Sequence, residues 1–534
     1  MAFLLLLALL ALHAFSTMGV YVLSDDLAWV QRAVADSHKP WNAFVQPLFG
    51  DYYRPIPELV WTLNYRLWGF DFDGHQLMYI LMWLAGVCAV YAVGCRLGGR
   101  IAGFAAAALV GLNYFYLLIA SWKSWYTTLT EFVAVLAWVW ATLRWHESRR
   151  ARYAIASAAL AAVAVLSREL APLVISAIVL AGFVLPNFKA AEEKSRRRAA
   201  MWLVVWAVVT GAVLLALPAY RNVAVAFLEK AQGPATAVRA GGAKEISGEY
   251  AWKDFVHHTQ GIFENWGISR YLLWFATVYG YLRLRRERPA FANKYCRVLL
   301  GAIALGAVVF ALPWGAGRFG PKANDFARDW IQPVMSGILM LLFCAAAFSG
   351  DRTDRLLGAW FVASFLPILV LKDWSGAYHL LAFTALAFFT ARALAAFAHE
   401  VFLPALARLL GKAPAGREDD ARYALVAVLA ALLIIEAWML GSGVWVAQKK
   451  RDGIQERVAF GRAVEARVDR AIQGVLKAAG PARRVWVWPT PYAELAGLIL
   501  QEKYGFKVQR VDQPGLIGAQ FSDPLVPIRA DAGR

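Results

Sequence analysis

The feature that most constrains this chain is a series of apolar stretches, each about 15 to 23 residues long. A helix of that length crosses the hydrocarbon core of a bilayer. Hydrophobic residues make up 60% of the chain and charged residues only 17%, whereas about a quarter of the residues in a soluble domain are charged. The sequence therefore predicts an all-α polytopic membrane protein with about 13 transmembrane helices.

We expect the first apolar stretch to be an uncleaved helix rather than a signal peptide, because it lacks a basic start and is long enough to span. The predicted spans lie near residues 3–23, 76–95, 101–119, 127–143, 153–166, 170–186, 200–219, 270–283, 298–312, 331–348, 356–371, 380–398 and 423–441.

The formal charge of +18 does not indicate a nucleic-acid-binding protein. Arg and Lys cluster in short segments between apolar stretches, for example at 144–152, 187–199 and 283–297. This distribution is typical of cytoplasmic loops in membrane proteins. It places the N-terminus inside and, after an odd number of spans, the C-terminus outside.

Three long segments then face the outer side: residues 24–75, 220–269 and 442–534. In the first, the apolar spacing predicts two amphipathic helices, at 27–37 and 56–69, lying flat at the membrane interface. The second is rich in small residues and is a candidate lid.

The third outer segment predicts a helix at 447–480, followed by a strand, a helix and a second strand. This order is typical of a βαβ unit. We therefore divide the chain into a transmembrane domain, 1–441, and a small outer α/β domain, 442–534.

Two adjacent acids, Asp25 and Asp26, stand where the first apolar stretch ends. Ser24 or Asp25 could simply cap a helix that begins near Leu27, and acids suit the first turn of a helix. The alternative is a catalytic carboxylate that acts as a general base. Neighbours on a helix point about 100° apart, so only one of the two would face a given target.

The same outer loop contains the stretch FGDYYRPIPELVW at 49–61. A guanidinium such as Arg54 can bind phosphate with two hydrogen bonds, or it can extend toward the interface or pair with Asp51. Tyr53 and Glu58 are further candidates for substrate contacts.

The short outer turn LSREL at 166–170 places Arg168 and Glu169 between the fifth and sixth predicted spans. The two residues either form a salt bridge that anchors the turn, or Arg168 is a second cation that binds phosphate and Glu169 is a substrate contact beside it. Weaker candidates on the same side are Arg318, Lys322, Lys372 and His379.

No metal site is predicted. The stretch DFDGH at 71–75 more simply forms the turn into the second span, and no cysteine pair has metal-ligand spacing. No cofactor is expected, although the sequence leaves a divalent metal open.

The acidic pair after the first span, the YRP motif at 53–55 and the LSRE turn at 166–169 together resemble the GT-C glycosyltransferases. The similarity is greatest to the protein O-mannosyltransferase and lipid A aminoarabinose transferase branches, and it covers residues 1–441. The resemblance implies a GT-C fold with interfacial helices in the first outer loop.

The resemblance also implies roles for individual residues. Asp25 matches the catalytic carboxylate and Asp26 the second acidic position, while Arg54 and Arg168 match residues that bind the donor phosphate. Tyr53 stands where the aminoarabinose branch has an acid, which argues against that sugar. No tetratricopeptide pattern follows the last span, unlike the repeat-bearing O-mannosyltransferases.

The implied activity is the transfer of a sugar, with inversion, from a polyprenyl-phosphate donor to a hydroxyl of a glycan, lipid or protein. The partners would be the donor, the acceptor and membrane lipids. The composition, rich in Ala, Leu and Arg, is typical of a bacterium, which places the site at the periplasmic face of the inner membrane.

The main alternative is a transporter of a lipid-linked or anionic substrate. A transporter places ionisable groups near the bilayer midplane and often has repeated halves. Here most ionisable candidates lie at one face, and no repeat is evident. Another GT-C activity with a different lipid donor, and a receptor-like scaffold, stay open as well.

Overall fold

The computed structural model describes twelve main segments of the chain and a few single positions. These are residues 2–15, 17–18, 24–45, 53–113, 125–168, 170–181, 332–369, 379–402, 445–478, 483–487, 490–510 and 528–530, with 279, 293–294, 297–298, 301 and 304. The predicted spans at 200–219, 270–283, 298–312 and 423–441 fall wholly or almost wholly outside this part, as does the candidate lid at 220–269.

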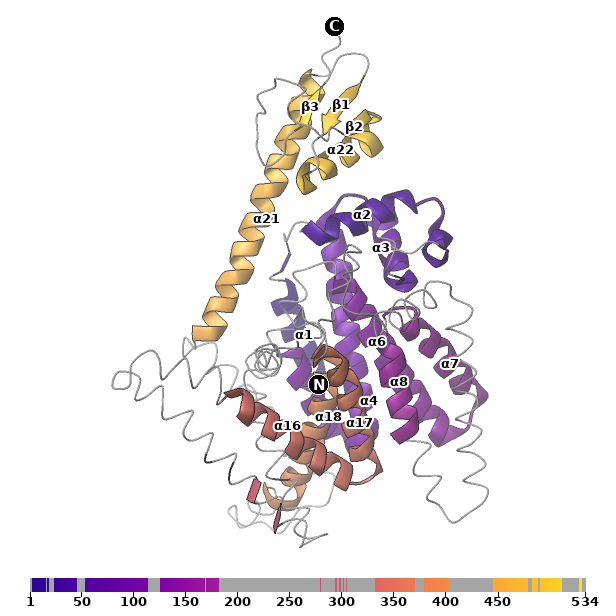
Figure 1. Cartoon of the computed structure of the whole chain (residues 1–534), viewed down its shortest axis with the longest axis vertical. Coiled ribbons are helices and arrows are strands. Elements are labelled where there is room, and N and C mark those ends of the chain that lie inside the picture. Colours follow the sequence, from indigo (N-terminus) through magenta and orange to yellow (C-terminus); the bar gives the residue numbers. More distant parts are fainter. Residues whose placement is uncertain are drawn as a thin grey trace, which may run out of the picture.

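A bundle of helices forms the larger part of the described molecule, and α2 and α3 lie across one end of it (Figure 1). Its elements are α1 (Ala2–Phe15), α2 (Ser24–Ala35), η1 (Pro40–Phe44), α3 (Pro55–Trp68), α4 (Phe72–Gly111), α6 (Tyr126–Ser148), α7 (Ala151–Val165), α8 (Ala171–Val179), α16 (Gln332–Ser349), α17 (Arg352–Leu369), α18 (Leu380–Phe397) and η6 (Ala398–Phe402).

Three of the described helices are long and apolar enough to cross a membrane: Phe72–Gly111, Tyr126–Ser148 and Leu380–Glu400. Shorter apolar helices occur at Ala2–Leu12, Ala151–Val165 and Met340–Ser349. Each of them overlaps a predicted span.

Helix α1 is shorter than the predicted span 3–23, because it ends at Phe15. Residues 17–18 form a turn, in which both the backbone N–H and the hydroxyl of Thr17 donate to the carbonyl of Ala14, at 3.0 and 2.7 Å. A threonine hydroxyl that bonds the backbone locally competes with continuation of the helix.

Helix α4 is two helices joined at Gly99, whose φ of 85° is left-handed. A side chain added at Gly94 would come within 2.7 Å of the backbone of Gly103. In a straight helix these residues would be about 13 Å apart along the axis. The chain therefore folds back at Gly99, in agreement with two predicted spans at 76–95 and 101–119.

The predicted inner and outer loops gather at opposite ends of the bundle. At one end the hydroxyl of Tyr126, the first residue of α6, donates to the carbonyl of His75 near the start of α4, at 2.5 Å. At the other end Arg96 pairs with Glu147 at 2.5 Å. The second end also contains the pair Arg392–Asp351, at 2.7 Å.

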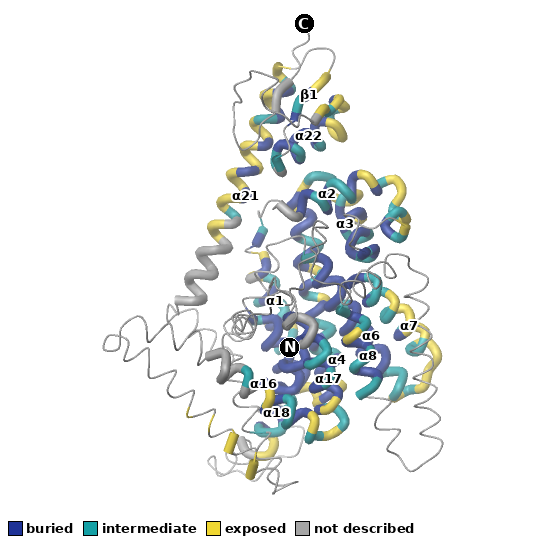
Figure 2. Tube along the Cα trace, in the orientation of Figure 1, coloured by how far each residue is buried: buried dark blue, intermediate teal, exposed yellow. Residues whose placement is uncertain are grey.

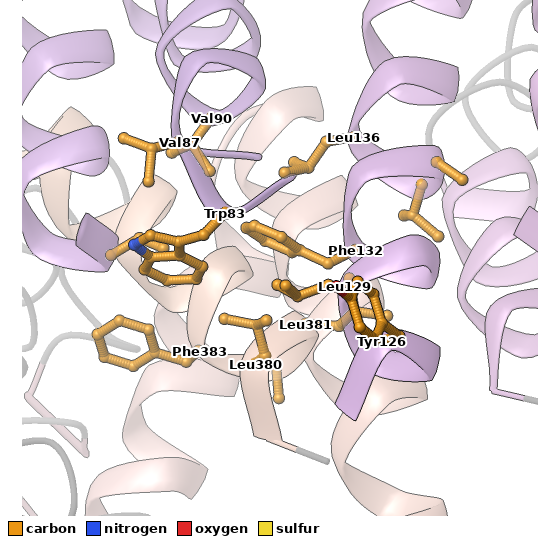
Figure 3. Packing of buried hydrophobic residues seen from close by; sticks show 14 of the residues in the cluster. Trp83, Val87, Val90, Tyr126, Leu129, Phe132, Leu136, Leu380, Leu381 and Phe383 are labelled. Atoms are coloured by element: carbon orange, nitrogen blue, oxygen red, sulfur yellow. The ribbon is translucent and has the colours of Figure 1, made fainter. Parts of the chain in front are cut away.

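The centre of the bundle is formed by aromatic and branched side chains from α4, α6 and α18 (Figure 3). Trp83 and Phe132 stack with their ring centroids 6.1 Å apart, and both are nearly or completely buried. Helix α18 is apolar on nearly all sides and contributes Leu380, Leu381 and Phe383 to this core, as expected of a helix surrounded by others. Figure 2 shows the buried centre and the more exposed α7 and α21.

The C-terminal elements are α21 (Trp445–Ala478), β1 (Arg484–Val487), α22 (Pro491–Tyr504), β2 (Lys507–Arg510) and β3 (Ile528–Ala530). The strand order is β2-β1-β3, with β1 and β2 parallel and β1 and β3 antiparallel. Helix α22 connects the two parallel strands, which is the βαβ order expected from the sequence. The three-residue strand β3 was not predicted.

We expect Gly103→Ala to destabilise the α4 hairpin by about 1–3 kcal/mol. The added methyl would lie 2.5 Å from the Cys95 sulfur and 2.8 Å from backbone atoms of Cys95 and Tyr91. Thermal unfolding in detergent measures the effect. The matched control is Gly337→Ala in α16, where the added methyl meets nothing within 4 Å; equal unfolding temperatures for the two variants would contradict the close packing.

Candidate functional site

Asp26 lies in the first turn of α2 and is completely buried. Its charge acts on the hydroxyls of Tyr79 in α4 and Tyr126 in α6. Helix α2 begins at Ser24, three residues earlier than the sequence predicts, so both acids belong to its first turn. The backbone of Asp25 is described, but its side chain is not.

A buried polar network surrounds the start of α6. The hydroxyl of Tyr126 accepts a hydrogen bond from the Asn64 amide of α3 at 2.8 Å and donates to the carbonyl of His75. The amide of Gln76 donates to the hydroxyl of Thr17 at 2.8 Å. These bonds connect α3, α4 and α6, and they tie the turn that follows α1 to α4.

Arg168 also contacts the start of α6. Its guanidinium donates to the hydroxyl of Thr128 at 2.7 Å and lies 3.7 Å from a carboxylate oxygen of Glu131. Only 4% of Arg168 and 1% of Glu131 is exposed. Arg168 thus pairs with an acid of a different helix, which the sequence does not predict. The predicted salt bridge to Glu169 lies outside the described residues.

The segment before α3 lies beside the turn that contains Arg168. The N–H of Ile56 donates to the carbonyl of Leu166 at 3.4 Å. Pro55 occupies the first position of α3, where the missing N–H costs nothing. Arg54, directly before it, is partly buried. The two arginines predicted to bind phosphate therefore belong to segments that touch each other.

Tyr53 is buried, and its hydroxyl donates to the carbonyl of Phe44 at 2.9 Å. Burial, and then the nearby charge of Glu58, raise the pKa of Tyr53. In this conformation Tyr53 holds the end of η1 against α3.

Helices α2 and α3 are held together by one cation between two acids. The Nε of Arg32 lies 2.7 Å from Asp36 and 3.3 Å from Glu58. Glu58 is 2% exposed, and its second oxygen, Oε1, meets no hydrogen-bond partner among the described residues. Burial raises the pKa of Glu58 to about 7, although Arg32 lowers it and Asp36 adds a smaller upward contribution.

His379 is 2% exposed, directly before α18, with its ring 6.2 Å from that of Phe365. It is part of the packed bundle. The candidates Asp51, Glu169, Arg318, Lys322 and Lys372 lie outside the described residues and stay predictions. Within the described part, no group of three or more His, Cys, Asp or Glu is arranged to hold a metal ion.

Sequence reasoning missed several residues of this region: Glu131, Thr128, Arg32, Asp36, Tyr79 and Tyr126. Only Glu131 gave a usable signal, as an acid within the predicted span 127–143, where ionisable residues are costly and usually functional or paired. The others are ordinary interface or helix residues in the sequence, and only tertiary packing brings them to the site.

No family model matches this chain, and no curated protein matches its sequence. Among solved structures, it is similar to ArnT from Cupriavidus metallidurans bound to undecaprenyl phosphate, with 14% identity and a TM-score of 0.47 over 96% of this chain and 86% of that one. The apo state of the same ArnT gives a TM-score of 0.45. The apo oligosaccharyltransferase of Archaeoglobus fulgidus is 16% identical, with a TM-score of 0.42, over 80% of this chain and 54% of that one.

At such identities and TM-scores the likeness identifies no donor, acceptor or activity for this chain.

We expect the stability of the protein to fall as pH rises from about 4.5 to about 7 through Glu58. The folded carboxyl holds its proton over that range, whereas the unfolded carboxyl loses it, so ionisation costs folded-state stability. Glu58→Gln should match the wild type at pH 5. At pH 8 it should unfold at a higher temperature, and its free energy of unfolding should exceed that of the wild type by up to about 3 kcal/mol. Unfolding temperatures between pH 5 and 8 measure this.

The control for this series is Glu456→Gln, at an exposed position of α21. If the difference between Glu58→Gln and the wild type does not grow with pH, Glu58 does not titrate as described.

Proposed function

We propose that this protein is an integral membrane glycosyltransferase that moves a sugar from a polyprenyl-phosphate donor to a hydroxyl acceptor. The observation that supports it is that the two arginines predicted to bind phosphate, Arg54 and Arg168, lie on touching segments, where the N–H of Ile56 donates to the carbonyl of Leu166. Arg168 is buried against Thr128 and Glu131 of α6. The predicted outer loop that contains Arg54 also contains the acidic pair, and a carboxylate base and a cation for the phosphate are the two groups that such a transfer needs.

In the proposed reaction the acceptor hydroxyl gives its proton to a carboxylate as its oxygen attacks the anomeric carbon. The bond between that carbon and the phosphate oxygen breaks, and polyprenyl phosphate leaves with its electron pair. In-line attack inverts the anomeric configuration. Arg54 and Arg168, on touching segments, would stabilise the charge that develops on the phosphate.

We assign the base to Asp25 rather than Asp26. Asp26 is completely buried, so in this conformation we do not expect it to reach an acceptor. Neighbouring positions on a helix are about 100° apart, so the two acids have different roles, and we propose Asp25 as the base. Asp26 then fixes the first turn of α2 on which Asp25 sits.

Position in the membrane supports this assignment as well. The segments that contain Asp25, Arg54 and Arg168 belong to the predicted outer loops, and they gather at one end of the bundle. In a bacterium that end faces the periplasm, where the acceptor would be a glycan, lipid or protein hydroxyl. The sugar and the acceptor are for experiment to identify.

The test uses the purified protein in nanodiscs with a panel of polyprenyl-phosphate sugars and an extract of envelope acceptors. One donor should be consumed and polyprenyl phosphate released. Asp25→Asn should reduce the rate about 10²–10⁴-fold, the usual contribution of a general base, while still binding the donor.

The matched control is Asp26→Asn, the neighbouring buried acid. It should lower the unfolding temperature more than Asp25→Asn does and retain more of the transfer rate. Consumption of no donor by the wild type would contradict the proposed function. An active Asp25→Asn beside an inactive Asp26→Asn would move the base to Asp26.

A further inference from the structure

Helix α22 of the C-terminal unit, residues 445–530, lies next to α2 (Figure 1). The amide of Gln31 in α2 donates a hydrogen bond to a carboxylate oxygen of Glu494 in α22, at 3.2 Å. The bond is part-buried and joins segments from opposite ends of the chain. It places the start of α22 over the helix that contains the acidic pair.

Electrostatic interactions also relate the C-terminal unit to this end of the bundle. Burial, and then the charge of Glu502 at the end of α22, raise the pKa of Tyr65 in α3. Partial burial, and then several acids that include Asp73 and Asp71 at the start of α4, raise the pKa of the carboxyl of Glu465 in α21. They add to the hydrogen bond above, which is the geometric evidence for docking.

Tyr492, two residues before Glu494, connects this contact with the acidic end of α2. It is half-buried and packs against the hydrophobic core. Its pKa is raised by burial and then by the charge of Asp26. The charge of Asp26 acts on Tyr79 and Tyr126 of the bundle as well, and among these three tyrosines only Tyr492 belongs to the C-terminal unit.

We propose that the docking of α22 on α2 is required for transfer, and that Tyr492, which packs against the core two residues before the Gln31–Glu494 contact, is a positioning residue of the transfer site. Transfer then requires the docked unit, and the inference rests on the proposed function. The physical reason is that electrostatic interactions are stronger in a site from which water is excluded. Docked α22 covers part of α2 at Gln31, the helix on which the acidic pair stands. Undocking would remove the Tyr492 hydroxyl and admit water beside Asp26.

A charge-reversal cycle at the docking contact tests this dependence. Gln31→Glu places two carboxylates against each other and should lower the transfer rate about tenfold, the effect of losing one hydrogen bond and gaining a repulsion. Glu494→Gln keeps an acceptor oxygen and should stay within about twofold of the wild type. The double variant Q31E/E494Q restores the hydrogen bond with donor and acceptor exchanged, and should recover the wild-type rate.

Docking is measured separately from activity. In a chain whose four native cysteines are replaced by alanine, Asp73→Cys and Glu465→Cys place two thiols on exposed positions of α4 and α21. The yield of a bismaleimide crosslink between them reports the docked unit. It should fall in Gln31→Glu and recover in the double variant.

Tyr492→Phe tests the positioning role itself. The variant keeps the ring and should keep the crosslink yield, while its transfer rate falls about tenfold, the effect of one lost hydroxyl interaction.

An unchanged rate in Tyr492→Phe would overturn the positioning role, and an unchanged rate in Gln31→Glu would overturn the need for docking. Either result leaves the proposed function standing. If the wild type consumes no polyprenyl-phosphate donor, the function and this inference both fall, while the crosslink yield still measures the docking.

Discussion

The arrangement of the candidate site depends on how the charged side chain of Arg168 is buried at the end of an apolar helix bundle. A buried guanidinium is tolerated only with an acid and further hydrogen bonds nearby. Glu131 and Thr128, on consecutive turns of α6, supply both to Arg168. This pairing fixes the 166–168 turn against α6, and the bond between Ile56 and Leu166 then fixes the start of α3. Arg32 of α2 pairs with Asp36 and with Glu58 of α3, and this second charge cluster holds α2 against α3.

The acidic pair at the start of α2 has a divided role in this arrangement. Asp26 is completely buried, as a residue that holds a helix end in place would be. Helix α2 begins at Ser24, so the pair of acids that looks like a helix start in the sequence is one. In the proposed mechanism Asp26 holds this first turn in place and Asp25 is the base.

Hydropathy predicted the described helices of the bundle well, because an apolar stretch bounded by charges has few other solutions in a membrane. The stretch 127–143 became α6, Tyr126–Ser148, and 380–398 became α18, Leu380–Phe397. The sequence also predicted the amphipathic helices of the first outer loop. The error was largest at α1, where a local hydrogen bond of Thr17 ends the helix early.

The site was harder to predict than the fold, for a physical reason. The motif residues Asp25, Arg54 and Arg168 stand out because charges at span ends are unusual. Their partners do not stand out, because Tyr126, Thr128 and Arg32 are common residues at a membrane interface. Which acid pairs with which cation depends on the packing of α2, α3 and α6, and that packing has no local sequence signature.

The most direct test of the central claim is photolabelling with a polyprenyl phosphate that bears a photoreactive group next to its phosphate. Peptide mapping then locates the labelled residues. If Arg54 and Arg168 form one phosphate site, label should appear in both 53–58 and 166–170, and unlabelled polyprenyl phosphate should compete it away. Competable label confined to other segments, with none in these two, would contradict the account.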